Sequence, residues 1–155
     1  MRRLAPLTLT LAILLPASPC WACSCIEAEP KEYAESAEVI FTGTVRSVET
    51  RMEADPSIPE LGEYPVFLVT LDAETSYKGN VTSTMQLRTA TDSAACGVNL
   101  SEGERYTVFA RELGGNLHTY LCSGTTEGAI EPAVYGLTAG TVAIGTGTAD
   151  TDPDQ

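Results

Sequence analysis

The cysteines are the residues whose spacing is most specific for chemistry. The chain has five of them, and two, Cys23 and Cys25, are separated only by Ser24. A bond between these two would close a strained small ring, so each is expected to form a disulfide with a distant cysteine, Cys96 or Cys122. Both crossed pairings satisfy this requirement. Either one closes two long loops, and each bond then stabilises the domain by about 4–5 kcal/mol in the chain-entropy model.

The other reactive side chains do not assemble into a catalytic centre. His118 is the only histidine of the chain, so it cannot by itself complete a metal site or a Ser-His-Asp triad. His118 is instead expected to occupy a strand position that faces the core or the solvent. Carboxylates such as Glu102 and Glu104 show no pairing of the kind that general acid–base catalysis uses. The sequence therefore predicts a protein that is not an enzyme and carries no cofactor.

Residues 1–22 are expected to be a secretory signal peptide. A short basic start precedes an apolar run, and this run is shorter than the ~20 residues of a transmembrane helix. Small residues offer cleavage after Ala22 or after Ala17, and the first of these leaves Cys23 at the N-terminus. A lipid anchor on Cys23 is the less favoured alternative, because the bulky Trp21 fits poorly before a lipidated cysteine.

Charge and the leader indicate where the protein acts and what it binds. The 155 residues carry 9 Lys or Arg and 21 Asp or Glu, a net charge of −12, and removal of a leader with two arginines brings it to −14. Such an acidic chain repels phosphate backbones, so we expect no nucleic-acid partner. We also expect no membrane span in the mature chain. An even number of remaining cysteines predicts a secreted, extracellular protein, or a periplasmic one in a bacterium, and we expect a monomer.

Hydrophobic periodicity predicts a small all-β domain with one helix. Pro30 begins a run of helix-forming residues, so a short helix is expected over residues 30–37. Residues 49–65, rich in acids and prolines, are expected to be a long exposed connection. One helix with five strands fits an OB-like barrel better than a two-sheet sandwich. Apolar residues at every second position predict five short antiparallel strands, at residues 39–45, 66–75, 85–89, 106–110 and 117–121.

The chain is expected to contain one folded domain over residues 23–128, followed by a C-terminal extension over residues 129–155. The extension begins with a mildly apolar stretch, but its prolines and glycines make it a poor membrane span. Residues 146–155 include three aspartates and are of low complexity. This tail is therefore predicted to be acidic and disordered.

Several local patterns of this domain occur together. They are Cys23-Ser24-Cys25, Tyr77-Lys78-Gly79, Ala94-Ala95-Cys96-Gly97, and a Leu-His-x-x-x-Cys-Ser stretch over residues 117–123. With these patterns the chain resembles the N-terminal, netrin-like domain of the tissue inhibitors of metalloproteinases, over residues 23 to 123. The resemblance implies a netrin-like barrel of the OB type. It also implies disulfides between Cys23 and Cys96 and between Cys25 and Cys122.

The resemblance further implies an inhibitory mechanism. In the family, the amino nitrogen and carbonyl oxygen of the first cysteine chelate the catalytic zinc of a metalloprotease, and here these atoms would belong to Cys23. Ser24 would enter the specificity pocket beside the zinc, and Ala94 and Ala95 would lie along the substrate cleft. The disulfide-bonded Cys25 and Cys96 complete this target-binding set. The implied partner is a secreted or surface zinc metalloprotease, whose zinc keeps one coordination position open.

The chain also departs from the family pattern. The family usually has a third disulfide, and Glu35 stands where one of its cysteines would be. The cysteine-rich second domain of the family is not expected here either. An alternative function is a netrin-like binding or adhesion module with purely structural disulfides, which would bind through the barrel surface or an acidic loop around Asp55 and Glu60.

Overall fold

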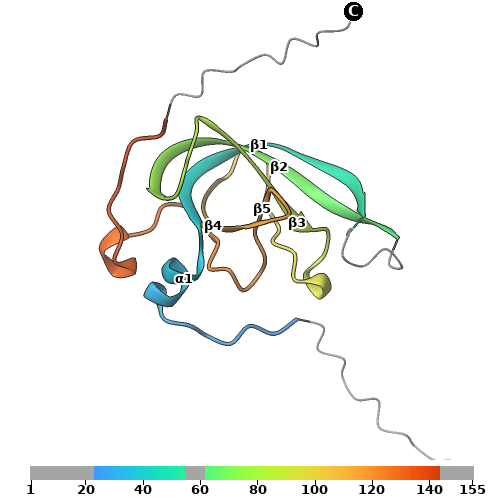
Figure 1. Cartoon of the computed structure of the whole chain (residues 1–155), viewed down its shortest axis with the longest axis horizontal. Coiled ribbons are helices and arrows are strands. Elements are labelled where there is room, and N and C mark those ends of the chain that lie inside the picture. Colours follow the sequence, from blue (N-terminus) through green and yellow to red (C-terminus); the bar gives the residue numbers. More distant parts are fainter. Residues whose placement is uncertain (1–22, 55–61, 144–155) are drawn as a thin grey trace, which may run out of the picture.

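The computed structural model describes residues 23–54 and 62–143. The predicted signal peptide and the predicted acidic tail lie outside these residues, as do residues 55–61 with Asp55 and Glu60. Figure 1 shows the elements of the described part. In chain order they are α1 (Pro30–Ser36), β1 (Val39–Ala54), β2 (Glu63–Lys78), β3 (Thr84–Ala90), η2 (Ser93–Ala95), β4 (Arg105–Leu113), β5 (Asn116–His118), β6 (Thr126–Glu127) and η3 (Pro132–Tyr135).

Strands β1 to β5 form a ring that is nearly a closed barrel. β1 pairs with β2 and with β4, β2 pairs with β3, and β4 pairs with β5, all of them antiparallel. The ring closes where Arg88 of β3 meets His118 of β5 in a parallel pair. The predicted five-stranded barrel with one short N-terminal helix is confirmed. The expectation of antiparallel pairs throughout is wrong at the contact between β3 and β5.

The predicted connection over residues 49–65 is wrong at both ends, which belong to strands. β1 and β2 continue as a paired two-stranded arm as far as Ala54 and Glu63, and Figure 1 shows this arm extending past the ring. From Glu49 onward the β1 side chains are exposed, except for the half-buried Glu53. Because no β1 side chain beyond Val48 is buried, no alternation of apolar and polar residues marks this part of β1 as a strand.

The fifth strand is shorter than predicted and ends at His118. Beyond it, the Thr119 hydroxyl donates to the Phe109 carbonyl at 3.0 Å and lies 2.9 Å from the Ser123 hydroxyl. The Ser123 amide in turn donates to the Tyr120 carbonyl. These contacts turn the chain out of the sheet, because buried hydroxyls that find local partners compete with strand pairing.

Two apolar clusters lie on opposite sides of β1 and β4. Phe41 and Val108 belong to the cluster inside the barrel, whereas their neighbours Ile40 and Phe109 belong to a second cluster that packs against α1. This alternation follows from the strand geometry, since successive side chains point to opposite faces. The second cluster also takes in apolar residues of the predicted C-terminal extension, namely Ile130, Tyr135 and Leu137.

Basic side chains hold the C-terminal end of α1, the helix that includes Glu35. Lys78 Nζ donates to the carbonyl oxygens of Ala34 and Glu35 at 2.8 and 3.3 Å. Arg111 Nε donates to the carbonyl oxygen of Ser36 at 2.6 Å. A helix leaves its last carbonyls without intrahelical partners, and cations are favourable at that end. The helix is thus fastened to the barrel without a disulfide at Glu35.

Candidate functional site

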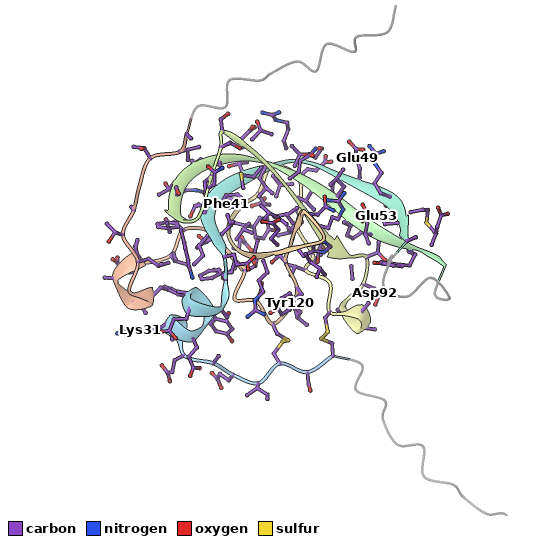
Figure 2. The ribbon with its side chains drawn as sticks, viewed as in Figure 1. Lys31, Phe41, Glu49, Glu53, Asp92 and Tyr120 are labelled. Carbon is purple, nitrogen blue, oxygen red and sulfur yellow. A yellow bond between two sulfur atoms is a disulfide. The ribbon has the colours of Figure 1, made fainter. Side chains whose placement is uncertain are left out.

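Two disulfides tie the beginning of the described chain to two distant loops. Cys23 is bonded to Cys96 and Cys25 to Cys122, with Cα–Cα distances of 5.5 and 5.2 Å. This is the pairing that the family resemblance implies. Figure 2 shows both bonds, which join the N-terminal segment to loops that lie near the labelled Asp92 and Tyr120.

The bonded segments form one surface, which we refer to as the disulfide edge and define as residues 23–27, 92–97 and 119–122. The Leu121 amide donates to the Cys96 carbonyl at 2.7 Å, so the second and third segments are also in direct contact. All six residues of the predicted target-binding set lie on this edge. Four of them are exposed, namely Ser24, Cys25, Ala94 and Ala95. The other two, Cys23 and Cys96, are half-buried.

The loop over residues 92–97 is held by a dense set of local contacts. Asp92 Oδ1 accepts a hydrogen bond from the Ala95 amide at 2.9 Å, and the Asp92 carbonyl accepts one from the Gly97 amide at 2.9 Å. Cys96 has a left-handed backbone with a φ of 61°, which an ordinary side chain adopts only when its surroundings enforce it. The loop therefore presents Ala94 and Ala95 on a fixed turn.

The structure adds two apolar residues to this edge that the sequence alone did not single out. Ile26 is 92% exposed and Leu121 is 44% exposed. Each is the direct neighbour of a bonded cysteine, Cys25 or Cys122, and this adjacency is the signal that could have identified them. Exposed apolar side chains beside exposed backbone are suited to contact with another protein.

Among the described residues, no group of three or more His, Cys, Asp or Glu side chains is placed to hold a metal ion. A cavity of about 320 Å³ opens beside the loop, lined by Phe67 and by parts of residues 90–99, and Asp92 is the one acidic residue of its lining. What this edge presents to a partner is exposed backbone, small side chains and the apolar side chains of Ile26 and Leu121.

Residues 21–127 match a family model described as tissue inhibitor of metalloproteinase. The chain belongs to the tissue inhibitor of metalloproteinase family. A comparison with curated proteins gives no match. Members of the family are inhibitors and not enzymes, so membership implies a metalloproteinase inhibitor with metalloproteinases as its targets. The family and the two disulfides together indicate an extracellular protein. None of the helices in the described ranges has the length and apolar character needed to cross a membrane.

Gly97 is expected to be essential for the shape of the loop next to Cys96. A Cβ atom at this position would lie 2.1 Å from the Ala90 carbonyl oxygen, so Gly97→Ala must displace the backbone. We expect the free energy of unfolding to fall by about 1–3 kcal/mol, together with weaker inhibition. Urea unfolding and inhibition titrations check this. Gly140→Ala, whose Cβ would lie an ordinary 3.4 Å from the Ser76 carbonyl, is the control, and equal losses in the two variants would contradict the prediction.

His118 serves ring closure in this inhibitor fold and makes its stability depend on pH. Burial lowers the pKa of the imidazole, the nearby Arg88 guanidinium lowers it further, and Glu53 opposes them. The folded state then binds fewer protons than the unfolded state, so the free energy of unfolding is expected to fall as the pH drops below 6.5 towards the folded pKa. His118→Gln should remove this component. Urea unfolding of both proteins at several pH values measures this component. The prediction is wrong if the free energy of unfolding depends on pH in the same way in the wild-type protein and in His118→Gln.

Proposed function

We propose that the protein, once it begins at Cys23, inhibits a secreted zinc metalloprotease by binding the enzyme's catalytic zinc through the amino nitrogen and carbonyl oxygen of Cys23. The proposal includes removal of residues 1–22 as a signal peptide, which creates the free amino group. The observation that carries it is the position of Cys23, which is bonded to Cys96 of the fixed loop and lies on the exposed disulfide edge.

Main-chain atoms of a terminal residue are suited to this chemistry. An amino nitrogen and the carbonyl oxygen of the same residue close a five-membered ring with a metal ion. They would occupy the position that a catalytic zinc keeps open for the attacking water. A free α-amino group has a pKa of about 7.7–8.0. A modest lowering beside Zn²⁺ therefore supplies the neutral lone pair that coordination requires.

The disulfides support the proposal because they fix the terminus before the partner arrives. A free chain end is usually frayed, and ordering it on binding would cost free energy. Here Cys23 and Cys25 are each bonded to a loop whose own backbone is hydrogen-bonded. Ser24 between them is exposed, and in the proposal it enters the specificity pocket, with Ala94 and Ala95 along the cleft.

The size of residue 24 is expected to set the preference among target proteases. Serine buries little apolar area, whereas leucine has three carbon groups in place of the serine hydroxyl, each worth about 0.8 kcal/mol when buried. Ser24→Leu should therefore tighten inhibition of a protease with a deep apolar pocket by about 2 kcal/mol, roughly thirtyfold. Inhibition constants against one deep-pocket and one shallow-pocket enzyme check this. An equal change for both enzymes would place residue 24 outside the pocket.

The direct test of zinc binding uses a secreted zinc endopeptidase whose zinc has been replaced by cobalt(II), because the visible absorption of cobalt(II) reports its ligands. The mature protein should inhibit with one-to-one stoichiometry and should change the cobalt spectrum as the complex forms. Inhibition with an unchanged cobalt spectrum would contradict chelation of the metal by Cys23, although the protein would still be an inhibitor. Binding without inhibition would instead favour the binding or adhesion module.

A further inference from the structure

The N-terminal segment of the disulfide edge has few non-covalent contacts of its own. Residues 23–28 precede α1 and belong to no strand. Their one backbone hydrogen bond among the described residues runs from the Ala28 amide to Tyr33 Oη, at 3.4 Å. The capping box of α1 begins only at the next residue, Glu29. Between the Cys25 disulfide and the helix, the Tyr33 hydroxyl is therefore the polar contact that sets the path of the segment.

The ring of Tyr33 meets the loop at the other end of the same disulfide. A Cβ atom on Gly124 would lie 2.8 Å from Tyr33 Cγ, and Gly124 has a φ of +94°. Only a residue without a side chain permits this close approach of ring and backbone. Gly124 follows Cys122 by two residues, and Cys122 is the partner of Cys25. One tyrosine thus contacts the N-terminal segment through its hydroxyl and the Cys122 loop through its ring.

We propose that Tyr33 is a positioning residue for the inhibitory N-terminus. The disulfides at Cys23 and Cys25 fix two points of the segment but leave rotation about their side-chain bonds. A third contact, at Ala28, restricts this rotation and helps to set the direction in which Cys23 and Ser24 project. A terminus that already holds its bound direction has a larger binding-competent fraction and so a higher apparent affinity. The effect on inhibition rests on the proposed function, whereas the effect on the order of the segment does not.

The test compares Tyr33→Phe with a matched loss of a tyrosine hydroxyl elsewhere. Tyr106 Oη accepts a hydrogen bond from the Ser101 amide at 3.3 Å, and Tyr106 lies in the barrel core. Tyr106→Phe therefore removes the same kind of bond away from the disulfide edge. Each variant keeps its ring, so folding is retained in both. Three quantities are measured on the full mature chain: hydrogen exchange at the Ala28 amide, the inhibition constant against a secreted zinc endopeptidase, and urea unfolding.

Tyr33→Phe is expected to speed exchange at Ala28 about fivefold or more and to raise the inhibition constant roughly three- to tenfold. Tyr106→Phe should change the exchange rate at Ala28 and the inhibition constant by less than about twofold. Its free energy of unfolding should fall by about as much as that of Tyr33→Phe. Unchanged exchange at Ala28 in Tyr33→Phe would overturn the proposal. So would faster exchange with an unchanged inhibition constant. If the wild-type protein inhibits no zinc protease, the proposed function fails, and exchange at Ala28 alone decides whether Tyr33 fixes the segment.

Discussion

A single glycine added in front of Cys23 is expected to raise the inhibition constant at least about a thousandfold, equivalent to about 4 kcal/mol. The added peptide bond converts the amino nitrogen into an amide, whose lone pair is delocalised and does not coordinate zinc at neutral pH. The extra residue would also occupy space beside the metal. Inhibition constants of the extended and unextended proteins, each checked by N-terminal sequencing, measure the effect.

The controls for this extension distinguish an effect on the N-terminal amino group from an effect on folding. The same glycine added at the C-terminus should leave inhibition unchanged. Acetylation of the α-amino group of Cys23 in the unextended protein should abolish inhibition, as the extension does. The melting temperature should be the same in all forms, because Cys23 keeps its bond to Cys96. Intact-mass measurement should show both disulfides in each form. Full inhibition by the extended or the acetylated form would exclude chelation by the amino group.

Replacement of Cys25 and Cys122 together by serine is expected to lower the free energy of unfolding by about 3–4 kcal/mol. Their bond joins residues 97 positions apart, but the remaining Cys23–Cys96 bond shortens the loop that is freed in the unfolded chain. Inhibition should weaken as well, because the segment after Cys23 loses a fixed point. Urea unfolding under non-oxidising and non-reducing conditions, together with inhibition titrations, measures both effects.

The matched variant removes the other disulfide, Cys23–Cys96, which joins residues 73 positions apart. The chain-entropy model predicts nearly the same loss of stability for it, within about 0.3 kcal/mol. Inhibition should weaken more in this variant, because it frees residue 23, the residue proposed to bind the zinc, from the loop. A loss of less than about 1 kcal/mol in either variant would show that the bonds do not act through chain entropy.

The barrel could be predicted because the side chains that point into it recur along each strand. In β1 the residues of the inner cluster, Val39, Phe41 and Val45, all lie on one side of the strand, and this is visible in the sequence as a period of two. The part of β1 beyond Val48 has no such pattern, so its sequence indicates a loop rather than a strand. The end of β5 depends on the partners of the Thr119 hydroxyl, Phe109 and Ser123. Such partners are brought together only by the tertiary fold, so sequence patterns do not reveal them.

The candidate site could be predicted as far as short motifs describe it. The spacing of Cys23 and Cys25 and the family resemblance were sufficient for the disulfide pairing. The exposure of Ile26 and Leu121 was not visible, because it depends on how the bonded segments lie on the barrel. The role of Gly97 was also hidden, since the Ala90 carbonyl that excludes a side chain there comes from the end of β3.

The exposed residues of the disulfide edge are anchored by covalent bonds and backbone contacts rather than by burial of their own side chains. Substitutions at exposed positions of this kind usually change stability by no more than about 0.5 kcal/mol. Ser24, Ala94 and Ala95 can therefore vary during evolution with little effect on folding. In the proposed mode of inhibition, such substitutions change the fit to a protease, while the buried residues of the barrel can stay the same.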